Sequence, residues 1–214
     1  MAVMPTSYIR AVLGPREELL ERIMRDSLLG HSLPPMQIDD NAARILQLFT
    51  LIRRPQRVIE VGTFFGYSSI YIARGLPENG LLTTLEVNRE VAELARQNLD
   101  KAGIGDHVEV VVGPAEDYLA RVEAGSIDMI FIDADKRSYP NYLKLCFPLL
   151  TSGGILIADD AFLHGDFSHE AIDNSGGNTE ISAIYTYNRA VIRSPRLFSA
   201  FIGTNNGLLV SYKK

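Results

Sequence analysis

Short runs rich in β-branched residues alternate with amphipathic segments along most of this chain. The β-branched runs, which we expect to be strands, are Arg57–Val61, Leu81–Glu86, His107–Val112, Ile127–Ile132 and Gly154–Ala158. The segments between them have the spacing of helices and are Tyr67–Arg74, Glu90–Lys101, Ala115–Val122 and Pro140–Leu150. Strands that alternate with helices predict βαβ units, and hence a parallel sheet with right-handed crossovers and helices on both faces.

Two further helical patterns, Arg16–Leu29 and Asp39–Arg53, lie before the first predicted strand. Pro34 and Pro35 separate them, because proline interrupts a helix and restricts the residue before it. We therefore expect an N-terminal pair of helices outside the alternating pattern.

The segment after the fifth strand differs in character. A polar, glycine-rich stretch, His164–Asn178, is followed by a helical pattern around Ile181–Ile192. Two closing strands are expected near Arg196–Ile202 and Gly207–Tyr212, joined by an Asn-Asn-Gly turn, and Asn-Gly is a strong hairpin signal. The sequence thus predicts five parallel strands and a closing hairpin whose last strand runs antiparallel to its neighbour.

Composition excludes several classes of protein. The 214 residues are 46% hydrophobic and 22% charged, as expected for one globular domain with its own core. A net charge of −5 and a pI near 5.4 disfavour nucleic acids and anionic membranes as partners, since both require a basic surface. One cysteine excludes a disulfide framework and a cysteine-based zinc cluster. Because we find no signal peptide and no apolar run of about 18 residues, we expect a cytoplasmic, single-domain protein.

The first predicted strand ends in an acidic residue and a glycine-rich turn. Glu60 lies on the strand, and Gly62 and Gly66 follow it before the next helix. Open α/β sheets bind ligands at this carboxyl edge, and Glu86 at the tip of the second strand suits a ribose diol. The GxxxG spacing differs from the GxGxxG of dinucleotide sites. The carboxylate of Glu60 suits a cationic ligand without phosphate groups, which favours S-adenosylmethionine. A nicotinamide cofactor, or a turn that binds no cofactor, is the alternative.

Acidic residues also follow the fourth and fifth strands. The fourth strand is followed by Asp133, Asp135 and Lys136, and the fifth by Asp159 and Asp160. Carboxylates gathered at one edge of a sheet repel one another unless a cation lies between them. Oxygen ligands without His or Cys indicate Mg²⁺, Mn²⁺ or Ca²⁺. The alternative is a set of solvated loop acids that cap the following helices.

These motifs together resemble those of a known family. The runs EVGTFFGYS, DADK and DD are similar to the cation-dependent O-methyltransferases, the family of caffeoyl-CoA and catechol O-methyltransferases, over nearly the whole chain. The resemblance implies an α/β, Rossmann-like class I methyltransferase fold, with helices on both faces of a seven-stranded, mostly parallel sheet whose last pair is reversed. It also implies S-adenosylmethionine as methyl donor, a divalent cation (Mg²⁺ first, Mn²⁺ or Ca²⁺ as alternatives) and a homodimer. Within one domain, residues 1–55 would be a helical cover, 56–160 the cofactor-binding core, and 161–214 the acceptor loop and closing hairpin.

The resemblance also implies roles for individual residues. Asp133, Asp159 and Asp160 match the metal ligands, although the family usually has Asn at the third position. Lys136 matches the proposed general base, which either takes the acceptor's proton or stabilises its oxyanion. The matches to cofactor contacts are Ile38 in the N-terminal segment, Glu60, Gly62, Thr63 and Ser68 at the methionine end, Glu86 at the ribose, Ala115 at the adenine, and Asp133. His164 stands where the family has an acceptor contact, with an exposed loop histidine as the alternative.

The expected acceptor is a small phenol. Two adjacent hydroxyls chelate a cation better than one, which favours a vicinal dihydroxy aromatic of the catechol type. Residues 161–188 contain no Lys or Arg, whereas phosphate recognition requires ammonium or guanidinium groups. A coenzyme A ester or a hydroxylated tRNA nucleoside, methylated by the same chemistry, is the alternative. A nicotinamide-dependent dehydrogenase would need GxGxxG, and a catalytically silent binding domain would lack the lysine and the carboxylates.

Overall fold

The protein is built around a seven-stranded sheet, seen in a computed structural model that describes residues 6–162 and 179–214. The strands are β1 (Arg57–Val61), β2 (Leu81–Glu86), β3 (Val108–Val112), β4 (Ile127–Ile132), β5 (Leu150–Ala158), β6 (Leu197–Ile202) and β7 (Leu208–Lys213). Their order is β3-β2-β1-β4-β5-β7-β6, with β1 to β5 parallel and β7 antiparallel to both of its neighbours. The predicted parallel sheet, with its closing hairpin and its last pair in reversed order, is confirmed.

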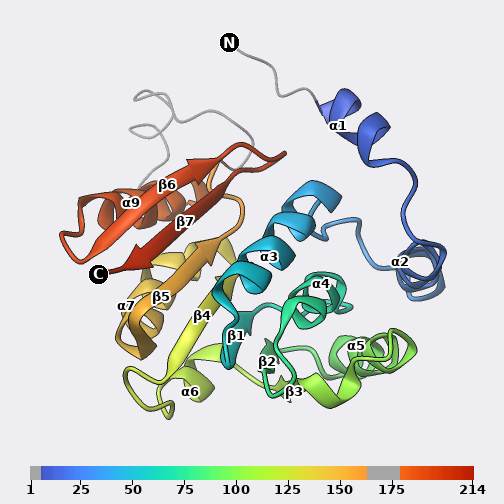
Figure 1. Ribbon diagram of the computed structural model, residues 1–214, viewed down its shortest axis with the longest axis horizontal. Coiled ribbons are helices and arrows are strands. Elements are labelled where there is room, and N and C mark those ends of the chain that lie inside the picture. Colours follow the sequence, from blue (N-terminus) through green and yellow to red (C-terminus); the bar gives the residue numbers. More distant parts are fainter. Residues whose placement is uncertain (1–5, 163–178) are drawn as a thin grey trace.

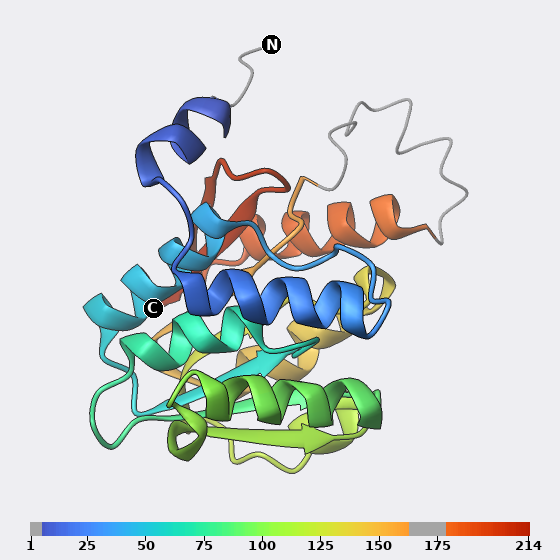
Figure 2. The ribbon, with the colours of Figure 1, turned by 90° about the vertical axis from the view of Figure 1, so that its right-hand side faces the viewer.

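Helices cover both faces of this sheet (Figures 1 and 2). One face carries α2 (Glu18–Gly30), α3 (Asp40–Arg53), α4 (Tyr67–Gly75) and α5 (Arg89–Lys101). The other face carries α6 (Ala115–Leu119), α7 (Tyr139–Leu149) and α9 (Glu180–Arg193). A further helix, α1 (Thr6–Leu13), precedes them, and short 3-10 helices lie at Gly105–His107 and Lys136–Ser138. No helix of residues 6–162 and 179–214 is long and apolar enough to cross a membrane.

Each central strand contributes to two hydrophobic cores. In β1, Val58 packs with the layer of α2 to α5, and Ile59 packs with the layer of α6, α7 and α9. In β4, Phe131 packs with the layer of α2 to α5 and Ile130 with the layer of α6, α7 and α9. The two differ because successive side chains of a strand point to opposite faces. Burial on both faces explains why these strands read as continuous hydrophobic runs rather than as alternating ones.

The order of the strands reverses between β1 and β4. The chain goes from β1 to β2 and β3 on one side, and then returns to place β4 and β5 on the other side. A crevice opens at the carboxyl ends of strands where the order reverses in this way. Gly62, directly after β1, and Asp133, directly after β4, stand at that position.

The structure differs from the sequence prediction at three elements. Thr6–Leu13 forms α1, where no helix was expected. β5 begins at Leu150 rather than Gly154, because Leu150 already pairs with Ile127 before the register shifts. Glycines 153 and 154 interrupt the β-branched run and so hide the start of this strand. Helix α6 ends at Leu119, earlier than the helical pattern suggested.

Candidate functional site

The backbone at the end of β1 leaves no room for a side chain. Gly62 has a φ of +98°, and a Cβ atom there would lie 2.0 Å from the backbone oxygen of Asp133. The Gly62 N–H donates to the carbonyl of Leu85 at 3.0 Å. Since only glycine tolerates both the positive φ and the close approach, this residue brings together the ends of β1, β2 and β4.

A cavity of about 610 Å³ lies at this turn. It is lined by five of the residues that the sequence predicted to bind a cofactor: Ile38, Gly62, Thr63, Ser68 and Asp133. Lys136 and Asp160 line the same cavity. Its volume is typical of small-molecule sites, which occupy about 300–1,000 Å³. These five predicted cofactor contacts therefore share one space with the predicted general base and one further predicted metal ligand.

Glu60 lies behind the cavity wall rather than on it. The side chain is 0% exposed, and its carboxylate accepts hydrogen bonds from Ser68 Oγ (2.5 Å), Thr84 Oγ1 (2.6 Å) and Ser69 Oγ. Because Thr84 donates its only proton to Glu60, Thr63 Oγ1 donates to Thr84 Oγ1 across 2.6 Å. Burial raises the pKa of Glu60 to about 7, although the hydroxyl donors favour the charged form. Glu60 thus supports Ser68 and Thr63, which do line the cavity.

Glu86 is the last residue of β2, and Ala115 begins α6, shortly after β3. Neither is among the described residues that line this cavity. The two carboxylate oxygens of Glu86 accept from the backbone N–H groups of Phe64 and Asn88, each at 2.9 Å. Phe64 has a φ of +50°, so Glu86 holds a strained residue of the glycine turn. Each carboxylate oxygen retains a lone pair for a ligand hydroxyl.

A lysine lies between two of the predicted metal ligands. Lys136 Nζ is 2.8 Å from Asp133 Oδ1 and 2.5 Å from Asp160 Oδ2. Burial raises the pKa values of Asp133 and Asp159, and the charge of Asp160 raises both further. Burial alone would lower the pKa of Lys136. The surrounding groups outweigh burial and raise that pKa above its ordinary value, with the largest contributions from Tyr139 and Asp133. Lys136 is therefore an ammonium ion in this arrangement.

The three predicted metal ligands converge only in part. Asp133 and Asp160 line the cavity at the glycine turn, whereas Asp159 lines a second cavity of about 430 Å³ that shares part of segment 35–38 with the first. Within residues 6–162 and 179–214, no group of three His, Cys, Asp or Glu side chains is arranged to hold a metal ion. The donor chemistry nevertheless fits a hard divalent cation, since crowded, buried carboxylates gain from a positive charge between them. That position is taken by the Lys136 ammonium.

Tyr139 contributes a polar group that the sequence analysis missed. Its hydroxyl is 3.2 Å from Lys136 Nζ and donates toward the backbone oxygens of Ile132 and Asp159, each also at 3.2 Å. These two oxygens belong to the last residue of β4 and to the residue directly after β5. The only sequence signal is the spacing of three residues between Lys136 and Tyr139, which is one helical turn.

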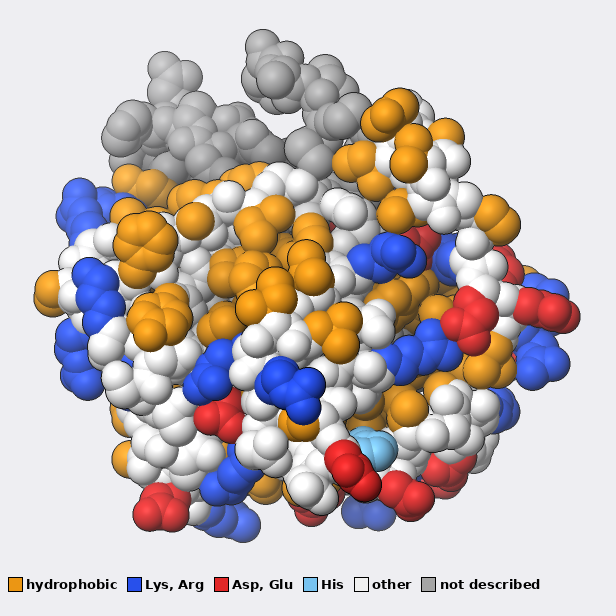
Figure 3. Space-filling model, in the orientation of Figure 1, with side chains coloured by type: hydrophobic (Ala, Val, Ile, Leu, Met, Phe, Trp, Pro, Cys, Tyr) orange, Lys and Arg blue, Asp and Glu red, His pale blue; other side chains and the backbone are white. Residues whose placement is uncertain are grey.

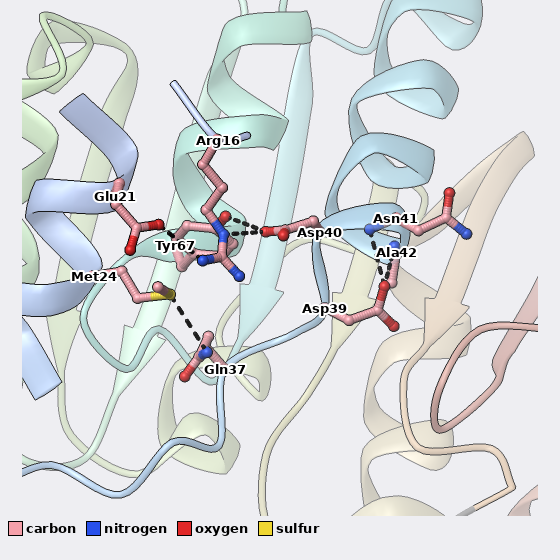
Figure 4. Close-up of polar contacts among 9 residues, drawn as sticks. All are labelled: Arg16, Glu21, Met24, Gln37, Asp39, Asp40, Asn41, Ala42 and Tyr67. Carbon is pink, nitrogen blue, oxygen red and sulfur yellow. Dashed lines mark hydrogen bonds and ion pairs between the residues drawn. The ribbon is translucent and has the colours of Figure 1, made fainter. Parts of the chain in front are cut away.

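A second missed feature ties the N-terminal helices to the cavity (Figure 4). Asp40 Oδ1 accepts from Arg16 Nε at 2.7 Å and from the hydroxyl of Tyr67 at 2.5 Å. Arg16 also pairs with Glu21 at 2.9 Å, and Asp39 caps α3 by accepting from two backbone N–H groups. Because Tyr67 lines the cavity, this network holds segment 35–38 next to it. The partners are 24 and 27 residues apart, so no local pattern announces them.

His164 lies outside the residues that the structure describes, so its acceptor contact stays a prediction.

Comparisons with known proteins agree on one family. The sequence model of the family described as O-methyltransferase matches residues 12–214. A catechol O-methyltransferase of Niastella koreensis is 32% identical over 204 residues, which cover 94% of this chain and 85% of that protein. A catechol O-methyltransferase of Mycobacterium tuberculosis is 38% identical over 141 residues, or 66% of this chain and 64% of that protein.

Solved structures show the same likeness. An O-methyltransferase from Bacillus cereus in complex with SAH superimposes with a TM-score of 0.87, at 30% identity, over 97% of this chain and 96% of that chain. TomG from Streptomyces achromogenes, an O-methyltransferase involved in tomaymycin synthesis and solved with SAM, has a TM-score of 0.85 at 27% identity, over 97% and 95% of the two chains.

Proposed function

The chain belongs to the O-methyltransferase family and is an S-adenosylmethionine-dependent O-methyltransferase, and we propose that it methylates one hydroxyl of a small catechol-like acceptor with the help of a divalent cation. One observation carries this proposal. Lys136 and the carboxylates of Asp133 and Asp160 line the same cavity as the glycine turn. Groups that can hold and activate an oxygen are thereby next to the place suited to the methyl donor.

The methyl donor is proposed to lie along the glycine turn. Helix α4 starts at Tyr67, so the positive end of its dipole and its free N–H groups favour the donor's carboxylate there. Gly62, Thr63 and Ser68 would contact the methionine end, with Glu60 supporting them from behind. Ile38 covers this end from the N-terminal segment.

The nucleoside end is proposed to follow the next two strands. Glu86 would accept hydrogen bonds from the ribose diol, using the lone pairs that Phe64 and Asn88 leave open. Ala115, at the start of α6, would pack beside the adenine.

Asp133, Asp159 and Asp160 would hold the cation, with Mg²⁺ as the expected ion and Mn²⁺ or Ca²⁺ as alternatives. When bound, the cation would favour the ionised form of the acceptor hydroxyl and fix its position. Asp160 has a φ of +56°, which Asp tolerates better than most residues, and its carboxylate then faces Lys136.

Lys136 is proposed to act on the acceptor oxygen. As an ammonium ion it can stabilise the developing oxyanion through an N–H donated from Nζ. Removing the proton itself would require a lower pKa than the surrounding carboxylates allow here. Lys136→Ala should lower turnover by about 100-fold or more while sparing affinity for S-adenosylmethionine. Lys144→Ala, on the exposed side of α7, is the matched control, and near-normal turnover of Lys136→Ala would remove Lys136 from catalysis.

The acceptor is proposed to be a vicinal dihydroxy aromatic without phosphate. Two relatives carry the name catechol O-methyltransferase, and residues 161–188 contain no Lys or Arg with which to bind a phosphate. The direct test compares caffeic acid with caffeoyl-CoA, and a strong preference for the thioester would overturn this acceptor class. A hydroxylated tRNA nucleoside belongs in the same panel.

We propose a homodimer on the basis of one exposed apolar surface. Leu48, Leu51 and Ile52 of α3 are exposed, and on the β6–β7 hairpin Phe198 and Tyr212 pair and are 69% and 50% exposed. Figure 3 shows hydrophobic side chains gathered over α3 and over the β6–β7 hairpin. The two aromatics alone leave on the order of 200 Å² exposed, a useful part of the roughly 800 Å² that each partner gives to a standard interface. Phe198→Glu should convert the dimer to monomers in light scattering; a wild-type monomer would contradict the assignment.

We also propose the cytoplasm as the location, in keeping with Cys146 as a free, buried thiol.

The experiment that tests the function is a screen with labelled S-adenosylmethionine. The purified protein is incubated with dihydroxy aromatics, matched monohydroxy analogues and the alternative acceptors, with and without EDTA. We expect transfer to catechols, loss of transfer with EDTA, and recovery with excess Mg²⁺. Transfer to monohydroxy analogues at equal rates, unaffected by EDTA, would refute the proposal.

A further inference from the structure

Tyr139 places a single hydroxyl at the centre of the reacting groups. Its side chain is 0% exposed, and its ring packs edge-on against Tyr187, with ring centroids 5.4 Å apart. The hydroxyl meets three partners at 3.2 Å: Lys136 Nζ and the backbone oxygens of Ile132 and Asp159. A hydroxyl so deeply enclosed does not interact with solvent, so these contacts determine its orientation.

The donors and acceptors at this point match one another. An ammonium has three N–H donors, and Lys136 has three acceptors within reach: Asp133, Asp160 and the hydroxyl of Tyr139. The hydroxyl accepts from Lys136 and has one proton of its own, which it shares between the oxygens at the ends of β4 and β5. Those backbone oxygens are fixed by the sheet, so Tyr139 transmits the position of the sheet to the lysine.

Tyr139 differs from the two carboxylates in one respect. Asp133 and Asp160 are proposed to turn to a cation, and the bonds that they make to Lys136 would then be given up. The Tyr139 hydroxyl is not part of that cluster and would remain the fixed acceptor of the lysine. The Lys136 ammonium also lies 5.2 Å from the centroid of the Tyr139 ring, a distance at which a cation is attracted to the face of an aromatic ring.

We propose that Tyr139 is a positioning residue for the methyl transfer: its hydroxyl holds Nζ of Lys136 at the acceptor oxygen. This inference rests on the proposed role of Lys136 in catalysis. Tyr139 does not itself touch the acceptor or the methyl donor; it acts through the lysine. Its removal therefore slows the chemical step without weakening the binding of S-adenosylmethionine.

The chain provides a matched control in Tyr187. Tyr187 is also buried, with 1% of its surface exposed, and its ring packs against the ring of Tyr139. Its hydroxyl, however, has no hydrogen-bond partner among the described residues. Tyr139→Phe and Tyr187→Phe remove the same atom from the same aromatic cluster. Only the first change removes a contact to Lys136.

The experiment measures kcat and the KM for S-adenosylmethionine, with a catechol as acceptor, for wild type, both Phe variants, Lys136→Ala and the double variant Tyr139→Phe/Lys136→Ala. We expect Tyr139→Phe to lower kcat about tenfold, the usual effect of losing a hydrogen bond to a charged group. Its KM for S-adenosylmethionine should stay within about twofold of wild type, and Tyr187→Phe should match wild type in both constants. On the Lys136→Ala background, Tyr139→Phe should change kcat by less than about twofold, because the two residues act as one unit.

A second measurement does not depend on activity. The urea midpoints of unfolding of the same variants form a double-mutant cycle, and the shift caused by Tyr139→Phe should be larger with Lys136 present than on the Lys136→Ala background. Equal kcat for Tyr139→Phe and Tyr187→Phe would overturn the inference while leaving the proposed function intact. So would an undiminished effect of Tyr139→Phe on the Lys136→Ala background. A wild-type protein that methylates no catechol would overturn the proposed function, and the kinetic role of Tyr139 with it; the unfolding cycle still decides whether the contact exists.

Discussion

Replacing Glu60 with glutamine should change how the stability of this protein depends on pH. Glu60 is fully buried, and burial raises its pKa from 4.5 to about 7. In the unfolded chain the carboxyl group returns to its ordinary pKa. Between pH 4.5 and 7 the folded protein therefore binds more protons than the unfolded chain, and the free energy of unfolding falls as pH rises. The contribution of protonated Glu60 is complete below pH 4.5 and is lost as pH passes 7.

The size of this effect follows from the interval between the two pKa values. Each pH unit corresponds to about 1.4 kcal/mol, so an interval of about 2.5 units gives about 3 kcal/mol. Glutamine has the shape of the neutral carboxyl and does not titrate; its amide oxygen can accept from the hydroxyls of Ser69 and Thr84, and its amide nitrogen can donate to Ser68 Oγ. The free energy of unfolding of Glu60→Gln minus that of wild type should therefore rise by about 3 kcal/mol from about pH 4.5 to about pH 8.

The assay is urea unfolding of both proteins at several pH values across this range. Other titrating groups are common to both proteins and cancel in the difference. Ser69→Ala is a matched variant, because it keeps Glu60 buried but removes a donor that favours the charged form; its loss of stability with rising pH should exceed that of wild type. A difference between Glu60→Gln and wild type that stays constant across this range of pH would refute the reasoning.

Two further substitutions test the geometry of the site. Gly62→Ala should lower the free energy of unfolding by more than about 3 kcal/mol, since the added Cβ meets the backbone of Asp133 at 2.0 Å in a backbone region unsuited to alanine; a thermal midpoint close to that of wild type would show that the turn can open. Asp40→Asn removes the charge shared by Arg16 and Tyr67 and should cost about 1–2 kcal/mol locally. Hydrogen exchange in α2 and at the start of α3 should then speed up, and unchanged exchange there would contradict the proposed anchoring.

The sheet was predictable because its pattern is local and repeated. Each central strand is a short hydrophobic run between helical segments, and the Asn-Gly turn marks the closing hairpin. Helix α1 was missed because Ile9 and Leu13 face a cavity lined by distant residues, a partner that no local pattern indicates. The early start of β5 was missed because pairing with Ile127, far away in the chain, holds Leu150 in the sheet.

The site was predictable where strand ends determine position, and less so where side chains choose their partners. Gly62, Asp133 and Lys136 follow β1 and β4 directly, so the topology places them in one cavity. Asp159 and Asp160 are consecutive, and neighbouring side chains diverge, which is why they line different cavities.

Glu60 was predicted as a cofactor contact but is bonded directly to Ser68, which lines the cavity, and reaches Thr63 there only through the hydroxyl of Thr84. Sequence spacing fixes which side of the sheet Glu60 faces, but not how many hydroxyls lie between its carboxylate and the ligand. Tyr139 escaped prediction since its partners are backbone oxygens, which leave no trace in the sequence.

The central claim is that three aspartates at two adjacent strand ends hold one divalent ion beside the methyl donor. Calorimetric titration of the EDTA-treated protein with Mn²⁺, in the presence of S-adenosylhomocysteine, tests it most directly. We predict one ion bound per chain, and loss of that binding in Asp159→Asn with the fold retained by circular dichroism. Absence of any bound ion in a wild-type protein that still methylates catechol in EDTA would contradict the claim.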